Sequence, residues 1–261
     1  MARARAAAAC LVFAAFVLFA AAPAWAEFGE RYALVIGNSD YAHVEGLPNT
    51  AGDAEAMAEA LESLRFTVFK GIDLTGEAFE RLIDEFDAAA ADADTVLFYY
   101  AGHGFQLDGL NHLAPVDAEL RDRSAINAET FVLNDIIDRI HRRQRQTIVL
   151  LDACRNNPLP PGARNGTGEG LAQLAGTGDG VFIAFATQPG NVSYDGTGSN
   201  SPFTEALLTH IGKPGRNISS LMIDVRNDVS DRTLGRQVPW DQSSLREDFY
   251  FNPTPEYLTA S

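Results

Sequence analysis

The sequence predicts an α/β fold: a mostly parallel central sheet of about six strands with helices on both faces. Two observations predict it. Short apolar runs rich in β-branched and aromatic residues alternate along the chain with longer segments whose apolar residues keep helical spacing. The runs are apolar at consecutive positions, as in parallel strands that are buried on both faces. With 261 residues, 46% of them hydrophobic, the chain suffices for one sizeable core and hardly for two.

The elements follow from these patterns in order. Strands are expected at 32–36, 66–69, 95–100, 147–151 and 181–186, with a short closing strand at 249–251. Helices are expected at 49–64, 74–91, 133–142, 203–211 and 218–232. A hairpin is expected around Asp108-Gly109, because this pair favours a tight turn between two strands, and its second arm should end at 115–117. Segments 158–180 and 187–200 are rich in turn-forming residues and are expected to be loops.

The first 26 residues are expected to form a secretory signal peptide. Arg3 and Arg5 precede an apolar run over 6–22, and Ala24-Trp25-Ala26 places small residues at the spacing of a cleavage site. An uncleaved membrane anchor is the alternative, although the run is short and Ala-rich for a spanning helix. We therefore expect an exported protein, periplasmic or extracellular, with one domain over 27–252 and a C-terminal tail over 253–261.

The charge of the chain limits its partners. Lys and Arg number 20 against 35 Asp and Glu, a net charge of −15, and removal of Arg3 and Arg5 with the leader would make it −17. Such a field repels nucleic acid and anionic membrane surfaces and favours cationic partners. We expect no nucleic acid, and no membrane contact once the leader is removed.

Cys154 is the candidate nucleophile. It follows the apolar run 147–151 after one acid and one small residue, so it should lie at the carboxyl edge of the sheet, where open α/β sheets place their chemistry. Once Cys10 leaves with the leader, Cys154 is a lone thiol that has no internal disulfide partner, and its presence in an exported protein suggests use. The alternative is a small buried hydrophobe, but the polar neighbours of Cys154 argue against it.

His103 is the candidate acid and base. It follows the apolar run 95–100 between Gly102 and Gly104, which should let the backbone turn sharply. If the strands before His103 and Cys154 are neighbours, as consecutive strands usually are, the imidazole and the thiol face each other and the thiol is activated. The backbone N–H groups of Gly104 and Cys154 are candidate oxyanion donors. The alternative for His103 is a structural role, in which the side chain forms hydrogen bonds within a turn. A structural role is preferred for the other histidines, which are expected on loops or helix ends: His43, His112, His141 and His210.

The two motifs together resemble those of the caspase-like cysteine peptidases, in the branch of paracaspases and bacterial orthocaspases and metacaspases. They are Tyr-Ala-Gly-His-Gly at 100–104 and Leu-Asp-Ala-Cys-Arg at 151–155, with the cysteine 51 residues after the histidine, where caspases have about 50. The further stretches that resemble this family are 33–38, 115–117, 185–190 and 233–240. The resemblance implies a caspase-like fold and an endopeptidase with a Cys–His dyad and no third residue.

The resemblance also implies a preference for basic P1 residues. Caspases have Gln two residues before the cysteine, whereas this chain has Asp152, as metacaspases and paracaspases do. Asp53 and Asp195 complete the acidic pocket that the resemblance implies for Arg, and less well for Lys, of a peptide or protein substrate. Other roles are open for each: a helix N-terminal charge for Asp53, a strand-end cap for Asp152, and an Asx-turn for Asp195.

Other chemistry finds little support in the sequence. No zinc-ligand spacing and no phosphate-binding glycine motif occur, so no metal or cofactor is expected. Some metacaspases require calcium, but no calcium site can be placed. Arg164, the only basic residue of 158–180, is the candidate site of self-processing. Two other functions stay open: a catalytically silent caspase-like module that binds cationic peptides, and a small-molecule esterase.

Overall fold

The computed structural model describes residues 29–153, 159–160, 170–174 and 178–254. The predicted leader, Cys154 and Arg164 lie outside these ranges. The described strands are β1 (Arg31–Gly37), β2 (Thr67–Ile72), β3 (Thr95–Ala101), β4 (Gly104–Leu107), β5 (Leu110–Leu113), β6 (Phe131–Val132), β7 (Gln146–Asp152), β8 (Val181–Phe185) and β9 (Trp240–Ser243). The described helices are α1 (Thr50–Ser63), α2 (Gly76–Ala89), α3 (Arg123–Glu129), α4 (Leu133–Ile140), α5 (Pro202–His210) and α6 (Ile218–Arg232).

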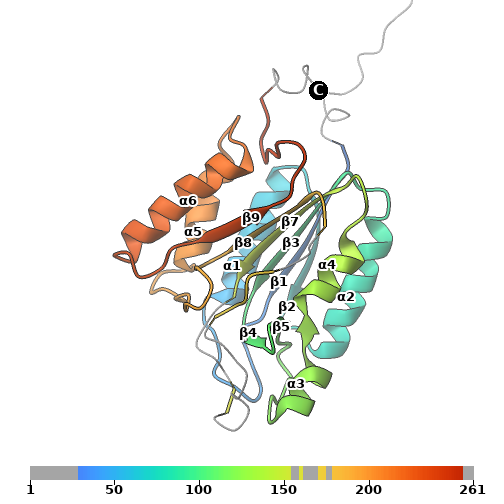
Figure 1. Cartoon of the computed structure of the whole chain (residues 1–261), viewed down its shortest axis with the longest axis vertical. Coiled ribbons are helices and arrows are strands. Elements are labelled where there is room, and N and C mark those ends of the chain that lie inside the picture. The colour runs from blue at the N-terminus through green and yellow to red at the C-terminus, as the bar shows by residue number, and fades with distance from the viewer. Residues whose placement is uncertain (1–28, 154–158, 161–169, 175–177, 255–261) are drawn as a thin grey trace, which may run out of the picture.

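Six strands form the central sheet in the order β2-β1-β3-β7-β8-β9, and all neighbours are parallel except β8 and β9 (Figure 1). The chain goes from β1 to β2 on one side and then to β3 on the other. The strand order therefore reverses at β1, the point where open α/β sheets form their ligand crevice. The predicted mostly parallel sheet is confirmed.

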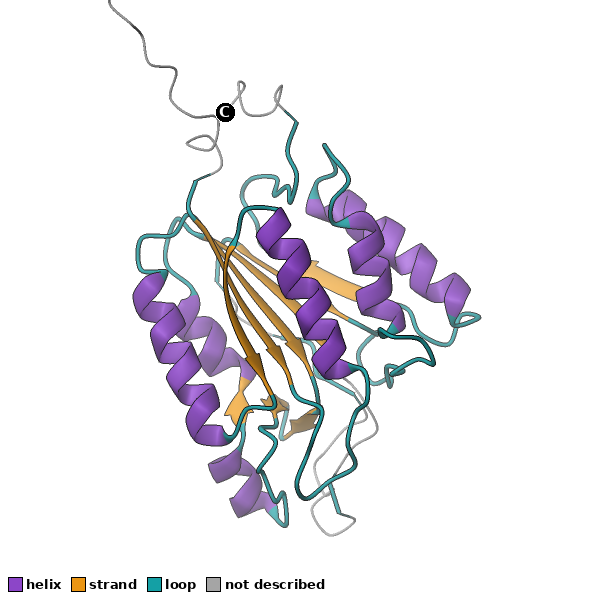
Figure 2. Cartoon of the chain, turned by 180° about the vertical axis from the view of Figure 1, so that it is seen from behind, coloured by secondary structure: helices purple, strands orange, loops and turns teal. Residues whose placement is uncertain are grey.

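Helices cover both faces of the sheet, as predicted (Figure 2). Along β3, Leu97 and Tyr99 face the core formed with α1, α5 and α6, whereas Phe98 and Tyr100 face the core formed with α2 and α4. All seven residues of β3 are buried. Two-sided burial explains why this strand has consecutive apolar residues instead of an alternating pattern.

The predicted closing strand is wrong in place. The last strand is β9, whereas at 249–251 only Tyr250 forms an isolated bridge, to Asn217. Phe249 and Phe251 are 3% and 1% exposed, and their rings meet edge to face at a centroid distance of 4.8 Å. Their alternating pattern therefore reports side-chain packing, not strand pairing.

The predicted hairpin is present as β4 and β5, but its second arm ends at Leu113 and not at 115–117. With β6 the two strands form a small antiparallel sheet beside the carboxyl edge. Asp108 and Gly109 have φ of 51° and 82°, the left-handed conformation that a two-residue hairpin turn requires. His112 lies within β5, not on a loop. Helix α3 escaped prediction because it has seven residues and only Ile126 is buried.

Candidate active site

The loop that carries His103 touches the residues directly before Cys154. Strands β3 and β7 are parallel neighbours, with Ala101 opposite Asp152, so the predicted adjacency is confirmed. The Gly102 N–H donates to the carbonyl oxygen of Asp152 at 3.4 Å. A Cβ added to Gly104 would lie 2.9 Å from the Cβ of Ala153. His103 is thus held beside Ala153, the residue that Cys154 follows in the chain.

The flanking glycines are needed for close approach and not for an unusual turn. The chain bends at Gly102 as predicted, but neither Gly102 nor Gly104 has a positive φ, so the bend itself does not require glycine. A Cβ at Gly102 would lie 2.6 Å from the Tyr100 hydroxyl oxygen and 2.8 Å from that of Tyr41. Larger residues at these two positions would push the His103 loop away from β7 and from the tyrosine hydroxyls.

The imidazole of His103 is buried and oriented by a backbone carbonyl. The side chain is 3% exposed, and its Nε2 lies 2.7 Å from the carbonyl oxygen of Glu45. Because a carbonyl oxygen can only accept, Nε2 carries the hydrogen in the neutral ring and Nδ1 carries the lone pair. The Tyr41 ring packs on the imidazole at a centroid distance of 4.6 Å. Nδ1 is therefore the nitrogen that can take a proton from a reacting group.

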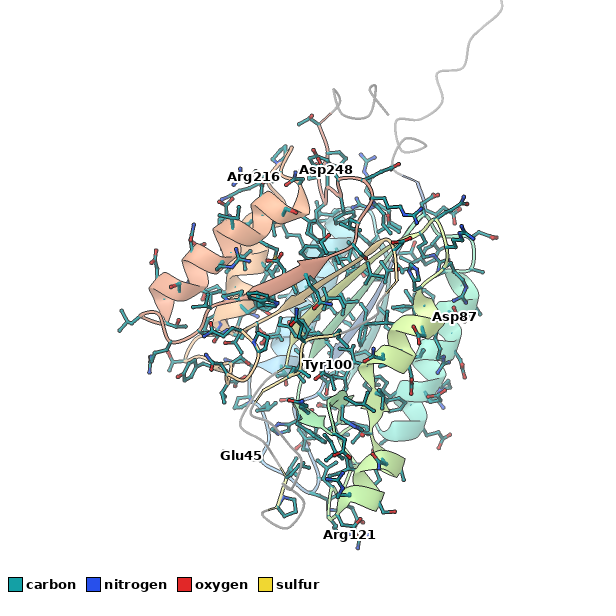
Figure 3. The ribbon with its side chains drawn as sticks, in the orientation of Figure 1. Glu45, Asp87, Tyr100, Arg121, Arg216 and Asp248 are labelled. Atoms are coloured by element: carbon teal, nitrogen blue, oxygen red, sulfur yellow. The ribbon has the colours of Figure 1, made fainter. Side chains whose placement is uncertain are left out.

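Two tyrosines fix the backbone of His103. The His103 N–H donates to the Tyr41 hydroxyl at 2.8 Å, and the Tyr100 hydroxyl lies 3.0 Å from the carbonyl oxygen of His103. Burial, followed by the neighbouring Tyr41, raises the pKa of Tyr100 well above its ordinary value, so its hydroxyl stays protonated as a donor. Figure 3 labels Tyr100 near the middle of the molecule and Glu45 below it.

Sequence reasoning did not identify Tyr41, Glu45 or Tyr100 as site residues. Tyr100 stands within the histidine motif and could have been considered there. Tyr41 and the Glu45 carbonyl come from the segment after β1, and nothing in the local sequence indicates that it folds over a histidine some 60 positions later.

Two of the three predicted acidic residues meet at one serine. Asp53, in the first turn of α1, and Asp152, at the end of β7, are fully buried. The Ser201 N–H donates to Oδ1 of Asp53 at 2.9 Å, and the Ser201 hydroxyl donates to Oδ2 of Asp152. Asn200 and Thr204 each add one side-chain hydrogen bond, to Asp53 and Asp152 respectively, both at 2.9 Å.

Asp195 lies nearby and is only partly buried. Its Oδ2 accepts from the backbone N–H of Asn49 at 3.3 Å, and its carbonyl oxygen accepts from the Asn49 side chain at 2.6 Å. Asn49 is the N-cap of α1, and Asp53 lies one turn further on. Asp195 and Asn200 also line a groove of about 470 Å³. The structure thus gathers the three acids around the N-termini of α1 and α5.

Ser201 is the site residue that the sequence could have indicated. It is the N-cap of α5, it is followed by Pro202 at the first helical position, and its hydroxyl accepts from Thr204 N–H at 3.0 Å. Ser-Pro ahead of an apolar periodic segment is a helix-start signal. The sequence does not indicate that the same hydroxyl also donates to Asp152, because this contact forms only in the folded chain.

Within the described residues, no group of three or more His, Cys, Asp or Glu side chains could hold a metal ion. In the same part of the chain no helix is long and apolar enough to cross a membrane.

The chain is similar in sequence to known proteins. The chain is similar over 127 residues, 48% of its length, to the human mucosa-associated lymphoid tissue lymphoma translocation protein 1, at 30% identity. That stretch covers only 15% of the human protein. The chain is also 23% identical to mouse caspase-1 over 242 residues, which cover 85% of this chain and 60% of mouse caspase-1.

Solved structures give the same result for the fold. The crystal structure of caspase-1 from Spodoptera frugiperda superposes with a TM-score of 0.64 at 20% identity, covering 87% of this chain and 91% of that one. The sequence profile of the caspase domain, a peptidase family, matches residues 30–250. The chain therefore belongs to the caspase-domain family.

Proposed function

We propose that the chain is a cysteine endopeptidase with a Cys154–His103 dyad that cleaves peptide bonds after basic residues, Arg in preference to Lys. The observation that carries this proposal is the contact of the His103 loop with Asp152 and Ala153, directly before Cys154. The orientation of His103 supports it further, since Nε2 donates to Glu45 and Nδ1 is left as the base.

The reaction needs one proton carrier and one nucleophile. The Cys154 thiol gives its proton to Nδ1 of His103, and the thiolate attacks the scissile carbonyl carbon. The N–H groups of Gly104 and Cys154 stabilise the oxyanion. His103 then gives its proton to the leaving amine as the C–N bond breaks, which leaves a thioester. Water, deprotonated by His103, attacks the thioester, and the acid product leaves as the proton returns to the thiolate.

The acid cluster supports the preference for basic P1 residues. A guanidinium that approached Asp53, Asp152 and Asp195 would gain charge-assisted hydrogen bonds, each worth about 1.5–3 kcal/mol. The planar fork of Arg suits two carboxylates better than the single ammonium of Lys. A P1 aspartate would meet like charges and be refused.

The dyad is tested by replacing Cys154 or His103 with Ala in the purified protein. Either change should lower kcat by about a thousandfold or more, because the two groups act as a unit. Far-ultraviolet circular dichroism should match that of the wild type. A Cys154→Ala protein that hydrolyses peptides at the wild-type rate would end the cysteine-peptidase proposal. Hydrolysis of esters but not of peptides by the wild type would favour an esterase.

The acidic pocket is tested separately with Asp152→Asn, which removes the charge but keeps an oxygen acceptor for Ser201 and Thr204. Cleavage after Arg should fall by about tenfold or more, the loss of one charge-assisted bond. Asp138→Asn, exposed on α4, is the matched control and should retain full activity. An Asp152→Asn enzyme with an unchanged Arg preference would contradict the pocket but leave the dyad in place.

A further inference from the structure

The groove beside Asp195 carries opposite charges. It has a volume of about 470 Å³ and is lined by residues of the loop after β8, the start of α5 and the end of α6. The charged and aromatic residues that line it are Tyr194, Asp195, Glu205, Arg232 and Arg236. Two arginines therefore line a groove that also contains Asp195, a residue of the predicted acidic pocket.

Arg236 is the cation of this groove that has no carboxylate. Arg232 is paired with Glu205 at 2.7 Å. Arg236 donates from Nε to the carbonyl oxygen of Thr233 at 3.0 Å, and within the described residues its two terminal nitrogens have no hydrogen bond or ion pair. Its outer edge, with the donors that suit a carboxylate, is therefore available.

The Arg236 guanidinium is held in place before any ligand binds. Its central carbon lies 5.1 Å from the centroid of the Tyr194 ring, within cation–π range, and Tyr194 is 40% exposed. The next residue, Gln237, is fully buried and joins the two segments. Its Oε1 accepts from the Tyr194 N–H at 3.0 Å, and its Nε2 donates to the Ala186 carbonyl at 2.9 Å. Ordering Arg236 on binding therefore costs little entropy.

We propose that Arg236, stacked on Tyr194, is a subsite for an acidic side chain of the substrate. The proposal rests on the proposed function, because Asp195 would hold the basic P1 residue at the neighbouring end of the groove. Asp195 and Arg236 line the same groove, so the two side chains that they would hold are near neighbours along an extended peptide. The preferred substrate then has Arg at P1 and Asp or Glu within three positions of it.

The test is binding of fluorescent peptides to the Cys154→Ala protein, which cannot cut them. Each peptide has Arg at P1 and either Glu or Gln at one of the three positions on either side. At one position Glu should bind about two- to fivefold tighter than Gln at low ionic strength, the upper range for a largely exposed ion pair. The ratio should fall toward one in about 1 M salt.

Variants decide whether Arg236 is responsible. Arg236→Gln should abolish the preference for Glu, and Arg236→Lys should keep only part of it, because Lys has the charge without the planar fork. Arg143→Gln, exposed just after α4 and away from this groove, is the matched control and should keep the full ratio.

No preference for Glu at any position, no binding of either peptide, or a preference that survives Arg236→Gln would each overturn the subsite. Cleavage of the Gln peptide by wild-type protein reports separately on the proposed function. A preference for Glu in binding, together with absent cleavage, would sustain the subsite and refute the peptidase.

Discussion

Replacing Ser201 by Ala should weaken the fold and the acidic pocket together. The Ser201 hydroxyl caps α5 by accepting from Thr204 N–H and also donates to the buried Asp152 carboxylate. Loss of a helix N-cap costs about 1 kcal/mol, and loss of a hydrogen bond to a charged group costs about 1.5–3 kcal/mol. The free energy of unfolding should therefore fall by about 2.5–4 kcal/mol, the sum of these two losses.

The assay is urea unfolding followed by far-ultraviolet circular dichroism, with Tm as a second reading. For a domain of this size about 3 kcal/mol corresponds to a fall in Tm of about 6–12 °C. Thr75→Ala is the matched control, since Thr75 caps α2 by accepting from Ala78 N–H at 3.3 Å but is exposed. It should lose about 1 kcal/mol, the cost of the cap alone.

A Ser201→Ala protein no less stable than Thr75→Ala would refute the reasoning. A double-mutant cycle with Asp152→Ala locates the interaction, because two residues in direct contact should show a coupling energy of about 0.5–3 kcal/mol. Strict additivity would mean that the Ser201–Asp152 hydrogen bond contributes nothing to stability.

Four further predictions follow from particular contacts. Gly104→Ala should displace His103 and reduce kcat at least about tenfold, since misplacing a catalytic group lowers the rate on this scale. Gly212→Ala is the control and should keep the wild-type kcat, because nothing lies within 4 Å of the added Cβ. Equal kcat values for the two variants would contradict the close-approach argument. Gln237→Leu should lower the free energy of unfolding by about 2–5 kcal/mol in urea titration, because two backbone groups lose their partner, and a loss under about 1 kcal/mol would show that water replaces the amide. Burial lowers the pKa of His112 in the folded state, so below pH about 6.5 the unfolded state binds more protons than the folded state. The free energy of unfolding should therefore decrease as the pH falls through this range, and His112→Gln should flatten this dependence. An unchanged dependence in the variant would refute the prediction. Active wild-type protein should be cut after Arg164 and Cys154→Ala should not, as read by intact mass, and an uncut active enzyme would show that this cleavage is unnecessary.

The sequence could predict those parts of the site that depend on strand ends. Residues that follow two neighbouring parallel strands lie at the same sheet edge, and because β3 and β7 are neighbours the loop of His103 touches Ala153. The acidic residues came from family resemblance, because carboxylates at 53, 152 and 195 have no local pattern that separates a pocket from a helix cap.

Other parts could not be predicted because their cause is tertiary. The Glu45 carbonyl orients His103 only after the segment following β1 has folded over β3. Phe249 and Phe251 have the alternation of a strand but are buried by packing, while β9, at the edge of the sheet, has mixed polarity that gave no strand signal.

The central claim, cleavage after basic residues, is tested most directly by kcat/KM on peptides that differ only at P1. The purified wild-type protein should prefer Arg to Lys and should barely cleave peptides with Gln or Asp there. The Arg-to-Gln ratio should be about a hundredfold or more, corresponding to about 3 kcal/mol from charge-assisted hydrogen bonds. Equal rates after Arg and Gln, or cleavage after Asp, would contradict the account.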